Sequence, residues 1–207
     1  MRVVCIADTH GCYQKLRLPS GDVLIHAGDM TAQSNFEEVR DFLTWFGAQE
    51  HAHRILVAGN HDRLHETDAD IAAALTPSGV TYLQDRGCII GGLKFWGSPV
   101  QPEFMNWAFN RRRGREISAH WSMIPEDTDV VVTHGPAYGI LDHDVRGRNH
   151  GCADLRKRLE VIQPRLHVCG HIHSGHGIGK LGRTVMVNAA ICDDDYRPSH
   201  PPLVIDL

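Results

Sequence analysis

The stretch VVCIADTH, residues 3–10, decides the fold and points to a metal site. It is a run of β-branched and aliphatic residues that ends on Asp8, with His10 two positions later. Short runs of this kind predict buried strands, and residues 2–7 are expected to form the first one. Because ligands bind beyond the carboxyl ends of strands in open α/β sheets, Asp8 and His10 are expected to face a ligand.

Four later runs of the chain have the same form, a short apolar stretch that ends on a polar donor. They are VLIHAG before Asp29, ILVAG before Asn60 and His61, VVVT before His134, and LHVCG before His171 and His173. Strands are expected over residues 22–27, 54–58, 129–133 and 165–169. The donors that follow them are therefore expected to converge on one spot.

A metal site is the expected result of this convergence. Oxygen and imidazole donors without a thiolate suit Mn, Fe, Zn or Ni. One Asp or His at a strand end is more often a capping or turn residue, but five such elements in chain order argue against chance. The expected ligands are too many for one ion and about right for two: Asp8, His10, Asp29, Asn60, His134, His171 and His173.

The spacing of the donors supports this interpretation. Asp8 and His10, like His171 and His173, stand at i and i+2, and in extended chain such residues project to the same side. Gly28 precedes Asp29 and Gly59 precedes Asn60. A glycine at a strand end lets the backbone turn sharply and approach a bound group closely.

The ordered set of motifs Asp-Thr-His, Gly-Asp, Gly-Asn-His-Asp, Thr-His-Gly and Gly-His-Ile-His resembles the calcineurin-like metallophosphoesterases. Four segments are similar to the branch of the animal metallophosphoesterase-domain proteins, which includes bacterial class III phosphodiesterases: GSPVQPEFMNWAFN (97–110), THGPAYGILD (133–142), GCADL (151–155) and the final PPLVIDL. The resemblance covers nearly the whole chain. It implies an α/β fold, built as a two-layer β-sandwich flanked by helices, that carries a dinuclear metal centre and hydrolyses phosphoesters.

The resemblance also implies how the ligands divide between two divalent transition-metal ions. One ion would be bound by Asp8, His10, Asp29 and His173, and the other by Asp29, Asn60, His134 and His171, with Asp29 bridging. Manganese is the first expectation, with Fe, Zn and Ni as alternatives. A water between the ions, with its pKa lowered by them, would be the nucleophile.

Two residues beside these ligands are expected to take part in catalysis. His61 follows Asn60 directly and is the expected acid, which would stabilise charge or donate a proton to the leaving oxygen. Asp62 would orient His61 and keep it protonated, or would instead form a structural bridge.

Phosphodiester hydrolysis is the expected function, with cyclic nucleotides or other small phosphate esters as substrates. A phosphomonoesterase and a nuclease are the enzymatic alternatives, and a non-catalytic interaction scaffold with the same fold is the rival of another class. The net charge of −4 argues against broad binding to nucleic acid or anionic membranes. The retention of every ligand and of His61 argues against the scaffold.

Composition indicates one domain over residues 1–207, since this length allows a sizeable single core. The six cysteines are expected to be free thiols, because Cys5 and Cys169 lie within expected strands. A first strand that begins near residue 2 leaves no room for a signal peptide. No apolar run approaches the roughly 20 residues needed to span a bilayer. A cytoplasmic enzyme is expected.

The remaining elements follow from periodicity and capping signals. Ser34 and Glu37 form an expected capping box for a helix to about Gln49, with Phe36 at the start of its apolar face. Residues 80–98 are expected to form strands of the second sheet, and 135–150 a loop. Further expected elements are helices over 68–75, 116–123 and 152–162 and strands over 183–188 and 202–206.

Other polar clusters have two interpretations each. The arginines at 111, 112, 113 and 115 are expected to form a solvated face, with phosphate contact as the alternative. Trp107 and Asn110 would line the substrate mouth or pack in the core. A further metal cluster is the alternative to solvated loop residues for Asp142, His143, Asp144, His150 and His176, and Asp193, Asp194 and Asp195 are expected in a solvated turn.

Overall fold

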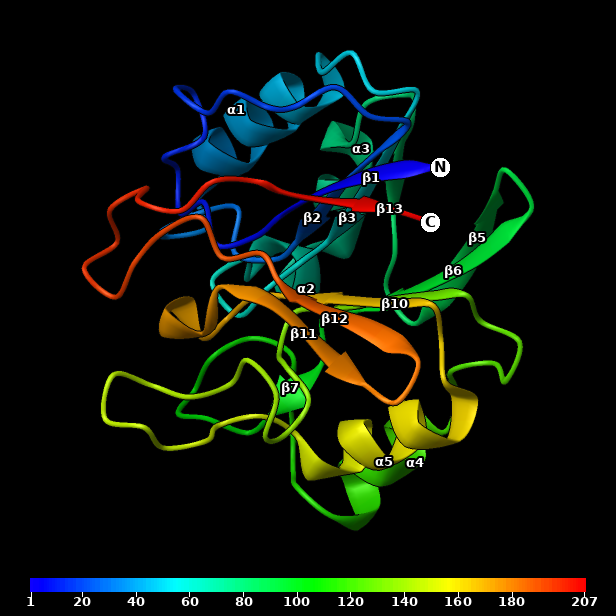
Figure 1. Cartoon of the computed structure of the whole chain (residues 1–207). Coiled ribbons are helices and arrows are strands. Elements are labelled where there is room, and N and C mark those ends of the chain that lie inside the picture. The colour runs from blue at the N-terminus through cyan, green and yellow to red at the C-terminus, as the bar shows by residue number, and fades with distance from the viewer.

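Two β-sheets packed face to face form the centre of the computed structural model, which describes residues 1–207 (Figure 1). The first sheet has the strand order β13-β1-β2-β3-β4, with bounds Leu203–Asp206, Arg2–Ile6, Val23–Ala27, His53–Val57 and Val80–Tyr82. The second has the order β11-β12-β10-β9-β6-β5, with bounds Gly177–Leu181, Thr184–Asn188, Leu166–Cys169, Val130–Thr133, Leu93–Ser98 and Arg86–Ile90. A two-stranded ribbon pairs β7 (Gln101–Pro102) with β8 (Asn110–Arg111).

The space between the sheets is filled by alternate residues of the strands. Val3 and Cys5 of β1 meet Val130 and Val132 of β9 in one buried cluster. Each fully buried aliphatic side chain of this kind stabilises the fold by about 1.5–3 kcal/mol. Both faces of these strands are covered, which explains why their sequences are continuous apolar runs rather than alternating ones.

Helices cover the outer face of each sheet, α1 and α3 at the top of Figure 1 and α4 and α5 at the bottom. Val4 of β1 packs with Phe42 of α1. Val131 of β9 packs with Trp121 of α4 and Leu159 of α5. The helix bounds are α1 Phe36–Gly47, α2 Leu64–Thr67, α3 Ala69–Leu75, α4 Arg115–Trp121 and α5 Ala153–Ile162, with a 3-10 turn at His173–Gly175. The predicted class, an α/β sandwich flanked by helices, is confirmed.

The start of α1 differs from the prediction. Asn35, not Ser34, is the N-cap, and its Oδ1 accepts the backbone N–H of Glu38 at 2.9 Å. The Ser34 hydroxyl oxygen instead accepts the N–H of Leu64 at 2.8 Å. Since the helix begins one residue later than predicted, Phe36 lies at its first position and is 43% exposed rather than in the core.

The assignment of residues 80–98 to the second sheet is wrong for its first strand. β4 pairs in parallel with β3, so it is the edge of the first sheet. The reason is the crossover through α3, which returns the chain beside β3 in the usual βαβ manner. β5 and β6 do belong to the second sheet, where β6 pairs in parallel with β9. β11, at Gly177–Leu181, was not predicted.

The prediction that the i and i+2 donors lie in extended chain is also wrong. Asp8, His10 and His171 have positive φ values of 50°, 41° and 69°. Their loops turn back immediately after β1 and β10 and gather on the left of the molecule in Figure 1. The donors converge through these left-handed turns rather than through a strand's alternation.

Two further expectations concern the whole chain. All six cysteines are free thiols in the structure, as predicted. The structure contains no helix with the length and apolar character needed to cross a membrane.

Candidate metal centre

Three overlapping groups of donors lie where the loops after β1, β2, β3, β9 and β10 meet. In each group the donor atoms all lie within 4.8 Å of one another. The groups are Asp8, His10 and His173; His10, Asp29 and His61; and Asp29, His134 and His171. Asp29 belongs to two of them and lies between the first and the last. Asn60 joins through its Oδ1, which is 2.9 Å from His134 Nε2.

The spacing of the donor atoms fits ligands around shared ions. Donors about 2.0–2.2 Å from one ion, with near-tetrahedral angles, lie roughly 3–3.6 Å apart. The Nε2 atoms of His10 and His173 are 3.2 Å apart. Asp29 Oδ2 is 3.4 Å from His134 Nε2 and 3.8 Å from His10 Nε2. Asp8 Oδ1 is 3.6 Å from His173 Nε2.

Backbone carbonyls fix the orientation of three of the imidazoles. The Nδ1 atoms of His10, His134 and His173 lie 3.3, 3.0 and 2.9 Å from the carbonyl oxygens of Thr31, Ala27 and Asp193, respectively. Since a carbonyl only accepts, each Nδ1 carries a proton and each Nε2 faces the other donors. This is the arrangement of a histidine prepared to bind a metal.

The buried charges of the cluster favour a cation within it. Burial lowers the pKa of His134, but the Asp29 and Asp8 carboxylates and the Ala27 carbonyl together outweigh it and raise the pKa to about 9. Burial also lowers the pKa of His173, but the Asp8 and Asp29 carboxylates and the Asp193 carbonyl together outweigh it and raise the pKa to about 9. The two carboxylates therefore attract positive charge, and divalent ions fit this set of residues in donor type, spacing and charge.

Metal removal is expected to make stability depend on pH. In the metal-free protein the pKa values of His134 and His173 are raised from 6.5 to about 9. The stability they contribute is fully present below pH 6.5 and is lost as the pH rises through 9. The unfolding temperature of the chelator-treated protein should therefore decrease as the pH is raised from 6.5 to about 9.

The unfolding temperature of the metal-loaded protein should instead rise over that pH range, because metal ions bind deprotonated imidazoles and so bind more tightly as the pH rises. Thermal unfolding with EDTA and with Mn²⁺ at a series of pH values provides the comparison. Parallel pH profiles for the two forms would contradict the proposed exchange of protons for metal.

Two glycines allow the close approach of the loops, as the sequence predicted. A Cβ on Gly28 would lie 2.3 Å from His134 Nδ1. A Cβ on Gly59 would lie 2.2 Å from Asp29 Oδ1 and 2.3 Å from its backbone nitrogen. No real Cβ tolerates such contacts, so these positions hold the donors together by lacking a side chain.

Gly59→Ala is expected to lower turnover by about 10²-fold, because a displacement near 1 Å at a reacting centre has an effect of that size. It should also reduce Mn²⁺ content, measured by elemental analysis. The matched control is Gly179→Ala in β11, where the nearest atom to a new Cβ is 3.5 Å away. Equal activity of the two variants would show that the loop at Asp29 tolerates the added atom.

His61 lies beside the metal ligands, at the mouth of the site. Its backbone N–H donates to Asp29 Oδ1 at 2.8 Å, and its Nδ1 lies 3.0 Å from the carbonyl oxygen of Ala32. Its ring packs against His10 and Trp107, with centroids 4.7 and 4.3 Å apart. Ala32, rather than Asp62, therefore orients the ring and leaves Nε2 without a partner.

Asp62 is fully buried beneath these loops and has no hydrogen bond to the His61 ring. Its carboxylate accepts the backbone N–H groups of Met30, Thr31 and Gly59 at 3.2, 3.1 and 2.7 Å. It also accepts the Thr31 hydroxyl at 2.9 Å. These bonds fasten the Asp29 loop to the Asn60 loop and favour the structural bridge over the direct orientation of His61.

Two buried histidines behind the donors were missed by sequence reasoning. His26 Nδ1 accepts the N–H of Gly28, so its Nε2 donates to the Thr9 hydroxyl at 3.0 Å. In the second sheet, His167 Nε2 lies 2.8 Å from the Thr133 hydroxyl. Each pair fixes a residue next to a ligand. A polar residue inside an apolar run, as in VLIHAG and LHVCG, was the available signal.

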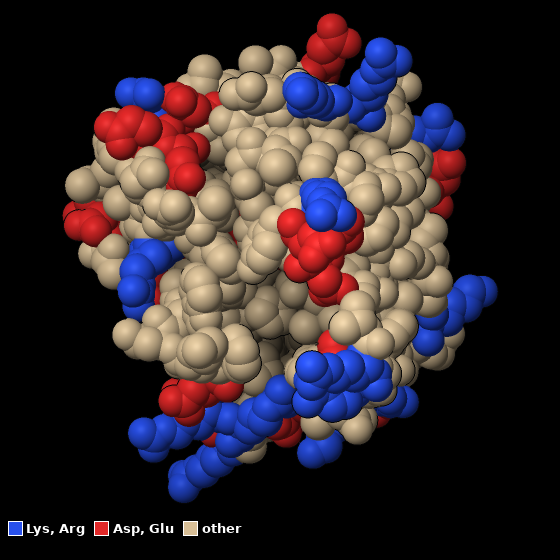
Figure 2. Space-filling view, turned by 90° about the vertical axis from the view of Figure 1, so that its left-hand side faces the viewer, with Lys and Arg blue, Asp and Glu red and all other residues tan.

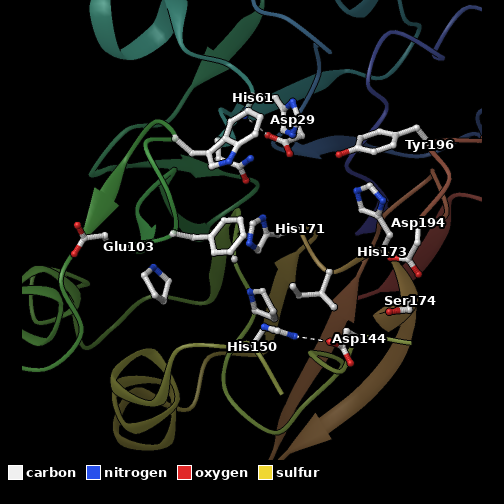
Figure 3. Close-up of a pocket in the computed structure, with 18 of the residues that line it drawn as sticks. Asp29, His61, Glu103, Asp144, His150, His171, His173, Ser174, Asp194 and Tyr196 are labelled. Atoms are coloured by element: carbon white, nitrogen blue, oxygen red, sulfur yellow. Dashed lines mark hydrogen bonds and ion pairs between the residues drawn. The ribbon is translucent and has the colours of Figure 1, made fainter. Parts of the chain in front are cut away.

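The donor cluster opens into a cavity of about 350 Å³ on the face shown in Figure 2. Lys and Arg side chains gather along its lower margin in that view, and Asp and Glu lie beside it. Trp107 lines the cavity, as one alternative predicted, whereas Asn110 binds the backbone of Phe104 and Met105. Tyr196, from the loop after β12, packs edge-on against His173 at one side of the cavity (Figure 3), with ring centroids 5.4 Å apart.

The other polar clusters have separate outcomes. Arg113 lines the cavity, while Arg111 lies 4.0 Å from Glu116. Asp142 is buried rather than solvated, because its carboxylate accepts the N–H groups of Gly139 and Gly151. The segment 135–150 forms no helix or strand, as predicted.

Comparison with known proteins identifies the family. The family model for calcineurin-like phosphoesterases matches residues 1–175. Metallophosphoesterase domain-containing protein 1 of Homo sapiens is 38% identical over 230 aligned residues, which cover 100% of this chain and 71% of that protein. A cAMP/cGMP dual specificity phosphodiesterase of Mycobacterium tuberculosis is 24% identical over 187 residues, or 83% of this chain and 54% of that protein.

Solved structures agree on the fold. The crystal structure of the protein TT1561 of Thermus thermophilus superimposes with a TM-score of 0.62 at 12% identity, over 90% of this chain and 88% of that one.

The chain belongs to the calcineurin-like phosphoesterase family. Members of this family bind two divalent metals, and the donor groups described above could hold metal in this chain.

Proposed function

We propose that residues 1–207 form one metal-dependent phosphodiesterase domain that hydrolyses small phosphate esters. The observation that carries this proposal is the pair of donor groups joined by Asp29 at the base of an open cavity. The named activity of the Mycobacterium tuberculosis relative supports diesters, cyclic nucleotides among them, over monoesters. Free thiols at all six cysteines support a reducing compartment, and we assign the protein to the cytoplasm.

The ligands proposed for the first ion are Asp8, His10, Asp29 and His173, and those for the second are Asp29, Asn60, His134 and His171. Two divalent ions in such a site supply positive charge for the attacking and leaving oxygens and lower the pKa of water. Manganese is the first ion to test, with Fe, Zn and Ni after it, because the donors are carboxylate, amide and imidazole.

The chain's own residues contribute orientation and proton transfer. Carbonyls hold His10, His134 and His173 with Nε2 toward the donors, so little reorganisation is needed when a ligand binds. His61, whose ring Nδ1 faces the Ala32 carbonyl and whose Nε2 has no hydrogen-bond partner, would in its protonated form donate a proton to the leaving oxygen. Asp62 acts as a positioning residue through the loops that carry Asp29 and Asn60.

A substrate panel tests the proposal. Metal-stripped protein is reconstituted with Mn, Fe, Zn, Ni or Mg and assayed on aryl phosphodiesters, aryl phosphomonoesters and cyclic nucleotides. We expect turnover of diesters that requires a transition metal and exceeds turnover of the matched monoester. A preference for the monoester would reassign the protein as a phosphatase, and no turnover with any metal would reject the enzymatic proposal.

A further inference from the structure

The cavity beyond the donor cluster is larger than a phosphate group requires. Pockets that hold small organic ligands have volumes of about 300–1,000 Å³, and this one has about 350 Å³. The space outside the metal centre is therefore available for an organic group attached to the phosphate.

Two exposed aromatic side chains line the cavity, and one of them, Trp107, packs against His61 beside the metal centre. Trp107 is 37% exposed and Phe104 is 58% exposed. Their loop is held in place by Asn110, whose side chain bonds the N–H of Phe104 and the carbonyl oxygens of Phe104 and Met105. Partly exposed aromatic rings on a loop with a fixed backbone suit a planar group.

The opposite end of the cavity contains a histidine paired with a carboxylate. His150 and Asp144 lie across the cavity from Asp29 and His61 (Figure 3). His150 Nε2 is 2.9 Å from Asp144 Oδ2, and the His150 side chain is 42% exposed. No hydrogen bond of the structure involves its Nδ1, so that atom is available to a ligand.

The carboxylate determines which ring nitrogen carries the proton. The bond from His150, together with the backbone N–H of Arg148, holds the pKa of Asp144 well below its usual range. Asp144 is therefore ionised and only accepts hydrogen bonds. It follows that Nε2 of His150 carries a proton, and that Nδ1 accepts a hydrogen bond whenever it carries none.

The backbone around His150 is also fixed. The guanidinium of Arg113 donates to the carbonyl oxygens of His150 and Gly151 at 2.8 and 2.9 Å. The N–H of His150 donates to the carbonyl oxygen of the buried Asp142 at 2.9 Å. The ring thus keeps one direction in the absence of ligand, as a recognition group requires.

We propose that His150, oriented by Asp144, forms a distal subsite that accepts a hydrogen bond from a hydroxyl or amino group at the far end of a planar organic arm. Trp107 and Phe104 cover the faces of that arm, and its phosphate lies at the donor cluster. This inference rests on the proposed function, since it deepens the substrate class of the same site.

Binding of arylphosphonates tests the subsite, because their C–P bond is not hydrolysed. Calorimetry on the Mn²⁺-loaded protein would compare methylphosphonate, phenylphosphonate, and one- and two-ring arylphosphonates with a hydroxyl at the far end. We expect phenyl to bind about tenfold more tightly than methyl. On whichever of the one- and two-ring compounds is long enough to reach His150, the hydroxyl should increase affinity by about two- to tenfold.

Variants separate the two contributions. Trp107→Ala should reduce the increase in affinity that the aromatic ring gives, whereas His150→Phe should abolish only the increase in affinity that the hydroxyl gives. Asp144→Asn should reduce the hydroxyl gain because the ring loses its orientation. The matched control is His143→Phe, on the same loop but outside the cavity lining, which should keep both gains.

The inference would be overturned if the hydroxyl still increased affinity in the His150→Phe variant. It would also be overturned if the hydroxyl increased affinity on neither the one-ring nor the two-ring compound, or if a carboxylate at the same position increased affinity more than the hydroxyl does. Turnover of an aryl phosphodiester by the same preparation keeps the two proposals apart. If the protein turns over the diester but binds arylphosphonates with and without the hydroxyl equally well, the subsite alone is rejected. If it binds arylphosphonates but turns over no diester, the proposed function is rejected.

Discussion

Asp29→Ala is expected to lower turnover of an aryl phosphodiester by about 10³-fold or more. The carboxylate belongs to two of the three donor groups, so its loss affects both proposed ions. Metal ions in such sites supply several kcal/mol of charge stabilisation, and each 1.36 kcal/mol is about a tenfold change in rate. Elemental analysis should show that the Asp29→Ala variant also binds less Mn²⁺ than the parent.

Asp41→Ala provides the control, because Asp41 lies on α1 with 57% of its side chain exposed. Its activity and metal content should equal those of the parent. An Asp29→Ala protein that binds two ions and turns over normally would contradict the assignment of Asp29 as the shared ligand.

His61→Ala is expected to lower turnover by roughly 10²–10⁴-fold, the range of general acid–base groups. Metal content should stay near that of the parent, because the other seven donors remain. The loss should be smaller for p-nitrophenyl esters than for alkyl esters, since p-nitrophenolate needs little protonation as it leaves. Steady-state kinetics on both ester types measure this difference.

His61 shares a donor group with His10 and Asp29, so a ligand role is the competing explanation. Equal losses for both ester types, accompanied by lost metal, would support that explanation. An unchanged rate would remove His61 from the mechanism. His53→Ala, at an exposed position of β3, is the histidine control.

The convergence of the donors could be predicted from the sequence because each follows a buried strand. Parallel strands bring their carboxyl ends to one edge, so Asp8, Asp29 and Asn60 meet whatever the details of their loops. The local route could not be predicted. Left-handed turns at Asp8 and His10 depend on tertiary contacts, such as the bond from the His10 N–H to the Asp29 carbonyl.

Side chains from loops were the part of the site that sequence patterns missed. Tyr196 and Phe104 lie in segments without apolar periodicity, so nothing in the sequence placed them at the cavity. His150 and Asp144 were predicted to be solvated loop residues, with a further metal cluster as the alternative. Their pairing depends on the fold of that loop, in which the N–H groups of Arg146 and Arg148 also bind Asp144.

The central claim is that this chain hydrolyses phosphoesters with a pair of metal ions joined by Asp29. The most direct measurement titrates metal-stripped protein with Mn²⁺ and follows bound metal and turnover of an aryl phosphodiester together. The account predicts saturation at two ions per chain, with maximal turnover only as the second ion binds. Saturation at one ion with full turnover, or full turnover of the stripped protein, would contradict it.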